Sequence, residues 1–205
     1  SPTTDQGATV TLNGDGTVSV DYSGISLATG ETLPDSFTYT TAGGTATVNV
    51  TIEGNTLQED WRLDNYGSIE NSGPGADDAI AVNELTNLVN FATDLDPNAP
   101  AGILKIVDGV VTSLGPPQVW TDDADGKIYF RYTRRADYEA IPLVLTEQFS
   151  PNVADYEDNV DPPIEVANGT GASGSAIEAV VVEFPLILPG SGRKARFGRL
   201  QVTAP

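Results

Sequence analysis

The chain has 205 residues, a formal net charge of −19 at pH 7, and no Cys, His or Met. The missing residue types exclude thiolate and imidazole metal sites, cysteine nucleophiles, the Ser-His-Asp triad and histidine acid–base catalysis. The acidic balance argues against nucleic acids and anionic membrane surfaces as partners, since both bind clustered Lys and Arg.

The composition favours a loop-rich all-β protein over a helical one. Charged residues make up only 19%, while Gly (21) and Pro (14) are plentiful turn formers. The length allows one large domain or two small ones. Because the chain begins at Ser1 and not at Met, we expect a piece of a longer, processed product.

The charges are unevenly distributed along the chain. Residues 1–61 and 136–192 contain no Lys or Arg. Eight of the ten basic residues form two groups: Lys127, Arg131, Arg134 and Arg135, then Arg193, Lys194, Arg196 and Arg199. One interpretation is a solvated acidic surface with incidental basic groups. The other is a molecule with an acidic end and a basic end, suited to head-to-tail contact.

Two hairpins are predicted near the N-terminus. Residues 7–24 alternate apolar and polar side chains on both sides of residues 13–16 (Asn-Gly-Asp-Gly), which tolerate positive φ. Residues 36–53 repeat the alternation around a turn at residues 42–44 (Ala-Gly-Gly). We therefore expect about four strands before residue 54.

The apolar faces of these hairpins need a covering layer. Their members are Val10, Leu12, Val18, Val20, Phe37, Tyr39, Val48, Val50 and Ile52. Burial of such side chains is worth roughly 1.5–3 kcal/mol each, so exposing all of them would cost on the order of ten kcal/mol. We expect the cover to come from preceding chain, from the rest of the molecule, or from another subunit by β-augmentation.

One helix is predicted in the middle of the chain. A polar junction containing Trp61 extends to about Pro74, and helical apolar spacing then covers residues 85–92. Asn83 or Asp78 is the expected N-cap, and residues 95–97 (Leu-Asp-Pro) the expected stop.

Seven strands are predicted in the C-terminal half, with the acidic segment 150–175 as an excursion over the surface. They span residues 103–107, 110–114, 117–120, 127–133, 141–149, 177–188 and 195–203. Short strands at this spacing predict a β-sandwich. The expected fold is thus all-β, with Ig-like sandwich modules and one short helix between them. The expected parts are an incomplete N-terminal module (1–55), a junction (56–100) and a C-terminal sandwich (101–205).

The N-terminal part resembles the latter half of bacterial cadherin-like and VCBS-type repeats. The resemblance rests on "LNGDGTVSVDYSG" and "DSFTYTTAGGTATVNVTIEGN" and on their spacing. Those repeats are Ig-like modules strung along secreted adhesins, and the matched part lacks their first strands.

Residues 60–205 resemble a C-terminal module of exported Verrucomicrobia-type surface proteins. The matching stretches are "DWRLDNYGSIENSGPGADDA", "NELTNLVNFATDLDPNAP", "IYFRYTRRAD" and "RFGRLQVTAP". In that family an Asp-rich, calcium-binding-like loop precedes the helix. Here Ala79, Ala81, Asn83 and Asn90 stand where acidic ligands would, which argues against Ca²⁺. The resemblance implies export and a surface context.

Two acidic groups are candidate Ca²⁺ ligands: Asp122, Asp123 and Asp125 with Gly126, and Asp155, Glu157, Asp158 and Asp161. An Asp-Gly turn between strands explains the first group without a metal. Paired carboxylates can hydrolyse glycosides, but nothing singles out two acids as a pair. We predict no catalytic, cofactor or metal residue.

Several aromatic residues could form a sugar-stacking platform: Trp61 and Trp120, with Tyr66, Tyr129 and Tyr138. The alternative, which we favour, is that both tryptophans pack in cores or at the domain junction. Asn49-Val50-Thr51 and Asn168-Gly169-Thr170 match the glycosylation sequon.

The leading hypothesis is a non-enzymatic, extracellular structural protein that forms a bacterial surface filament or adhesive fibre by strand complementation. Its expected partners are copies of itself or adjoining modules. The alternative is a carbohydrate-binding or accessory module of a secreted enzyme or adhesin, with polysaccharide as partner. A weaker third is a Ca²⁺-stiffened stalk.

Overall fold

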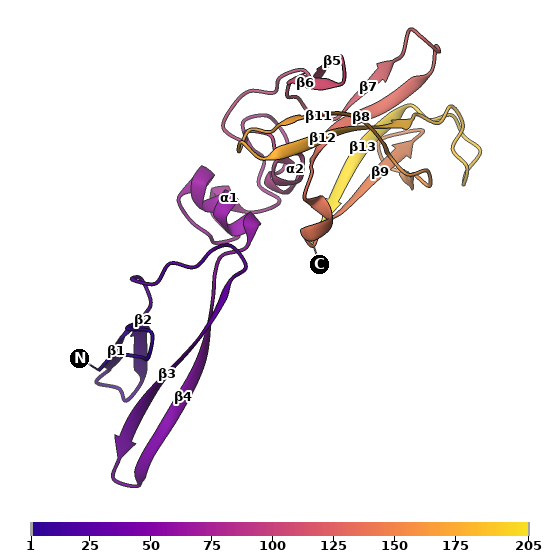
Figure 1. Ribbon diagram of the computed structural model, residues 1–205. Helices are drawn as coiled ribbons and strands as arrows, with labels where there is room; N and C mark the ends of the chain where they lie inside the picture. The colour runs from indigo at the N-terminus through magenta and orange to yellow at the C-terminus, as the bar shows by residue number, and fades with distance from the viewer. Residues whose placement is uncertain (1, 205) are drawn as a thin grey trace. The chain divides into compact units, whose positions relative to one another are not determined.

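Residues 2–204 are described by a computed structural model, which confirms the all-β class (Figure 1). The chain divides into two compact units, Ser1–Leu63 and Asp64–Pro205. The segment 56–100, set apart by sequence as a junction, is shared between them. Each unit is described by itself below.

Both N-terminal hairpins form where the alternation predicted them. Strands β1 (Thr9–Leu12) and β2 (Val18–Asp21) pair antiparallel, with Leu12 opposite Val18. Between them, the Asn13 side chain donates to the hydroxyls of Thr17 and Ser19, both at 2.8 Å. These bonds satisfy the polar groups of the turn and fix the register.

Strands β3 (Thr32–Thr41) and β4 (Gly44–Glu53) form a long two-stranded ribbon (Figure 1). Their register runs without a bulge from Thr32 opposite Glu53 to Thr41 opposite Gly44. Gly44 follows the two-residue turn with φ of 131°, which a side chain would strain. At the strand rise of about 3.3 Å per residue, the ribbon is about 33 Å long.

Unit 1 covers only part of the apolar set that sequence analysis identified. Val10 and Phe37 are buried, and Ala8 joins them. Leu12, Val18 and Tyr39 remain 73%, 43% and 46% exposed, and the other four members are half-buried. Within the described residues of this unit, the two hairpins form separate two-stranded sheets with no third strand.

Helix α1 (Leu57–Tyr66) corrects the prediction of a polar junction and of a single helix. It begins with a capping box: Thr56 Oγ1 accepts from the Glu59 amide at 3.2 Å, and a Glu59 carboxylate oxygen accepts from the Thr56 amide at 2.7 Å. A short 3₁₀ turn, η1 (Gly73–Gly75), follows.

Helix α2 (Asn87–Thr93) is the predicted helix, but neither expected residue caps it. Thr86 is the N-cap and accepts from the Val89 amide, because its hydroxyl lies one residue before the first turn. At the other end Asp94 adopts φ of 52° and closes the helix. The helix thus ends before the predicted Leu-Asp-Pro stop.

Unit 2 is a sandwich of two sheets. The first sheet has the order β5 (Lys105–Val107), β6 (Val110–Ser113), β11 (Ile164–Thr170), β12 (Ala176–Glu183), β8 (Ile128–Arg135), β7 (Gln118–Thr121). The second has the order β10 (Glu157–Asp158), β9 (Val144–Ser150), β13 (Phe197–Thr203), and a turn, η2 (Tyr138–Ala140), precedes β9. A buried cluster from β8, β9, β12, β13 and the segment that follows β12 joins the sheets: Phe130, Tyr132, Phe149, Val180, Val182, Phe184, Leu188 and Leu200.

The segment 150–175 was predicted to be an excursion over the surface, but it also contributes strands to both sheets. It contains β10 and β11, and β11 lies inside the larger sheet, parallel to β6 and antiparallel to β12. The sequence of β11, "IEVANGT", breaks the apolar alternation with Asn and Gly, and a register shift lies between Glu165 and Ala167. Its pairing therefore comes from the neighbouring strands, not from a local signal.

Helix α2 covers part of the outer face of the larger sheet. Thr133 of β8 is buried and donates to the Thr93 carbonyl at 2.9 Å, and the Arg135 guanidinium lies 5.3 Å from the Phe91 ring centre. Ile177 and Ala179, opposite these β8 residues, are fully buried. The remainder of this outer face is described in the next subsection.

Candidate functional site

The outer end of the β3–β4 ribbon is the most exposed regular structure in unit 1. We define the hairpin arm as residues 38–47, every one of which is exposed. No charged residue and no Pro occurs between Ser36 and Ile52. The arm therefore combines regular β-structure with a surface of hydroxyl, methyl and backbone groups.

The outer edge of β3 is shielded only near its middle. The Asp5 amide donates to the Ser36 carbonyl at 2.8 Å, and the Gln6 amide to the Asp35 carboxylate at 2.9 Å. Beyond Ser36, β3 pairs with β4 alone among the described residues. One edge of each strand in the arm thus presents unpaired amides and carbonyls.

The side chains of the arm hold its own register without blocking its edges. Tyr39 lies opposite Ala46, and the Thr40 and Thr45 hydroxyls are 3.0 Å apart. Soluble proteins usually protect such edges with charges, Pro, bulges or short strands. None of these devices occurs in the arm.

A second candidate surface lies on the open part of the outer face of the larger sheet. We call it the aromatic groove; it has a volume of about 420 Å³. Its polar and aromatic members are Trp120, Asp122, Tyr129 and Arg131, and its aliphatic members are Ile106, Ile164, Val166 and Val181. They come from β5, β7, β8, β11 and β12 and from the residue that follows β7.

Strand register brings the aromatic members of the groove together. Trp120 and Tyr129 are cross-strand partners with ring centres 6.0 Å apart and planes tilted by 30°. The Arg131 guanidinium lies 4.9 Å from the Trp120 ring centre, close enough for a cation–π interaction. One Arg131 amino group donates to the Leu104 carbonyl at 3.1 Å, while the buried Nε finds no acceptor among the described residues.

The structure brings only two of the five predicted platform residues into this groove. The favoured prediction was wrong for Trp120, which is half-buried at the groove and outside the core. Trp61 is buried in α1, in the part of that helix that belongs to unit 1. Tyr66 donates to the Asn87 side chain at 2.5 Å, and Tyr138 stacks 3.7 Å from the Arg134 guanidinium.

The first acidic group forms the turn between β7 and β8. Asp122 accepts from the Ala124 amide at 2.9 Å. Asp125 accepts from the Lys127 amide at 2.8 Å and from the Tyr129 hydroxyl at 2.7 Å, and these bonds hold the pKa of Asp125 below its ordinary value. These carboxylates stabilise the turn.

The second acidic group is divided among different partners. Asp155 pairs with Arg193 at 3.1 Å, Glu157 accepts from the Gly190 amide at 2.8 Å, and Asp158 accepts from the Gln148 side chain at 2.6 Å. Across residues 2–204 no three Asp or Glu side chains gather closely enough to hold a metal ion.

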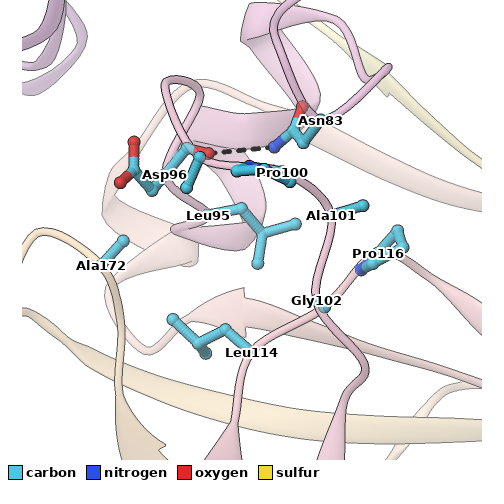
Figure 2. Close-up of a pocket in the computed structure, with 11 residues that line it drawn as sticks. Asn83, Leu95, Asp96, Pro100, Ala101, Gly102, Leu114, Pro116 and Ala172 are labelled. Carbon is cyan, nitrogen blue, oxygen red and sulfur yellow. Dashed lines mark hydrogen bonds between the residues drawn. The ribbon is translucent and has the colours of Figure 1, made fainter.

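Amides shape the loop before α2, where the resemblance suggested a calcium-like site. The Asn83 side chain donates to Asn90 Oδ1 at 2.5 Å and to the Asp96 carbonyl at 3.1 Å. Figure 2 shows Asn83 and Asp96 beside a small hollow of about 160 Å³ whose other walls include Leu95, Leu114 and Pro116. This hollow is mainly apolar and too small for an extended ligand.

The remaining predicted features are not among the residues of either surface. Arg193, Lys194 and Arg196 line a basic hollow beside Pro151. Both sequon asparagines are exposed within strands: Asn49 in β4, and Asn168 in β11, where its side chain donates to Glu165 at 2.8 Å.

No protein-family model, curated protein or solved structure matches this chain. The resemblances to cadherin-like repeats and to exported surface modules therefore stay predictions. Among the helices of the described residues, none has the length and apolar character needed to cross a membrane.

Proposed function

We propose that the protein is a non-enzymatic structural subunit of an extracellular filament or adhesive fibre on a bacterial surface, assembled by β-strand complementation. The hairpin arm carries this proposal. Its edges are regular, uncharged and free of bulges over residues 38–47. Such an edge is a template for pairing with another strand.

The energetics support pairing between copies. A two-stranded ribbon is at best marginally stable alone in water, and it gains from a third strand or a covering layer. The exposed Leu12, Val18 and Tyr39 add apolar area that a neighbouring subunit would bury. If the rotation between copies does not close, such contacts build a filament.

A charged pair placed in the arm tests this proposal. Thr38 and Thr47 are cross-strand partners. In the Thr38→Lys/Thr47→Glu variant the two charges attract within one hairpin, but they oppose close packing against another strand. We expect wild-type protein to form linear polymers by sedimentation velocity and negative-stain microscopy, and this variant to remain monomeric with an unchanged circular dichroism spectrum.

The matched control is Thr9→Lys, which places a cation opposite the carboxylate of Asp21 and so makes a pair of the same charges across the β1–β2 hairpin. It should polymerise like the wild type. A wild-type protein that stays monomeric at high concentration, or an arm variant that polymerises normally, would contradict the proposal.

A further inference from the structure

The aromatic groove carries chemistry that strand complementation does not use. Its apolar floor is part of the outer sheet face that α2 leaves open, and Trp120 is half-buried there. Outer sheet faces in a sandwich are usually polar, and concave apolar surfaces with a few polar groups are typical of ligand sites.

The polar groups of the groove favour a hydroxyl-rich ligand over an apolar protein partner. Arg131 and Asp122 provide a cation and a carboxylate. Glu183 is the cross-strand partner of Tyr129, and its carboxylate forms an ion pair with Lys127, whose Nζ lies 2.5 Å from Glu183 Oε2. An apolar protein surface would have to desolvate these charges, which is costly. A sugar hydroxyl can instead donate to a carboxylate and accept from a cationic side chain.

Arg131 supplies a second, independent observation. Its Nε is buried and has no acceptor among the described residues, although the same guanidinium bonds the Leu104 carbonyl. A buried donor without an acceptor destabilises the folded protein. This Nε is itself closed to a ligand, so its lost hydrogen bond marks a place where the protein gives up stability beside the groove, as occurs at functional sites.

We propose that the aromatic groove binds a pyranose ring of a neutral polysaccharide, stacked on Trp120, with its hydroxyls bonded to Arg131 and Asp122. The C–H face of such a ring covers apolar aromatic area, and its hydroxyls meet the charged groups. A net charge of −19 repels acidic polymers over long range, which favours a neutral one. This site does not depend on filament assembly.

Affinity electrophoresis in gels containing cellulose ether, xylan, mannan, starch or alginate tests the proposal, with calorimetry on oligosaccharides of any polymer that retards the protein. We expect saturable binding to at least one neutral polymer. Trp120→Ala should weaken it roughly tenfold or more, because the substitution removes both the stacking on the ring and the apolar area that the ring buries. Trp120→Phe should retain part of the affinity.

The control is Val119→Ala, the preceding residue of β7, which pairs with Phe130 on the opposite face and should leave binding unchanged. The arm variant Thr38→Lys/Thr47→Glu should also bind normally, so loss of assembly and loss of sugar binding are separable. Absence of binding to every neutral polymer, equal binding by Trp120→Ala, or binding to alginate alone would overturn the proposal.

Discussion

A buried tyrosine–carboxylate pair lies between the two sheets of unit 2. The Tyr132 hydroxyl donates to Glu147 Oε1, and the two residues are 1% and 6% exposed. Burial, with the nearby Glu147 charge, strongly raises the pKa of Tyr132 above its ordinary 10.0. The folded protein therefore holds this proton more tightly than the unfolded chain does.

This pair predicts a loss of stability in alkali. Because the pKa of Tyr132 is higher in the folded protein than in the unfolded chain, the protonated hydroxyl adds to the free energy of unfolding. This contribution is fully present below about pH 10, the ordinary tyrosine pKa, and is lost as the pH rises above it. Tyr132→Phe removes this dependence but leaves Glu147 Oε1 without the donor that Tyr132 supplies, at a cost of about 1–3 kcal/mol at pH 7. Urea unfolding from pH 7 to 11 should show that the difference in free energy of unfolding between wild type and variant becomes smaller above pH 10. A constant difference would contradict this explanation.

A reciprocal amide pair fixes the loop before α2. Asn90 is fully buried and donates to Asn83 Oδ1 at 3.1 Å, while Asn83 donates back at 2.5 Å. Asn90→Ala leaves the buried Asn83 amide partly unsatisfied, so we expect a loss of about 1–3 kcal/mol in denaturant unfolding. The exposed Asn98 side chain donates to Asn65 Oδ1 at 3.3 Å. Asn98→Ala should therefore lower the free energy of unfolding by less than about 0.5 kcal/mol. Equal losses in the two variants would contradict a structural role for the Asn83–Asn90 pair.

At the scale of elements, local signals predicted most strands. Both hairpins could be predicted because alternation and turn residues act over short distances. Strand β3 (Thr32–Thr41) differs from the prediction only in beginning four residues before residue 36. Helix α1 was missed although Thr56 and Glu59 have capping-box spacing. The low apolar content of its sequence, "LQEDWRLDNY", outweighed that signal.

Of the two candidate surfaces, the sequence predicts the hairpin arm but not the aromatic groove. The exposed hairpin follows from residues 36–53 alone, since its partners are local. The aromatic groove could not be predicted, because its residues come from five strands and meet only through non-local pairing such as Trp120 with Tyr129. One of these strands, β11, lacked a clear pattern of its own. Only the presence of aromatic residues was visible in sequence.

At the scale of the whole molecule, charge opposes association of copies. Residues 1–61 contain 8 acidic and no basic residues, while residues 62–205 contain 21 acidic and 10 basic ones, a net charge of −11. Both stretches are thus negative, and Arg193, Lys194 and Arg196 form only a local exception. Long-range repulsion should outweigh attraction between an acidic and a basic end.

Salt should therefore promote assembly. Raising NaCl from about 0.01 M to about 1 M shortens the screening length from about 30 Å to about 3 Å. We expect the protein concentration needed for polymerisation, measured by light scattering, to fall over this range. A concentration that rises with salt would instead indicate that attraction between acidic and basic surfaces dominates.

The composition of the hairpin arm also bears on its survival outside a cell. Enzymes of trypsin specificity cut after Lys or Arg, and the first such residue in the chain is Arg62, which is buried in α1. The arm can thus remain fully accessible without offering a cleavage point to this class of digestive enzyme. Where enzymes of trypsin specificity are present, the arm would stay intact because it contains neither Lys nor Arg.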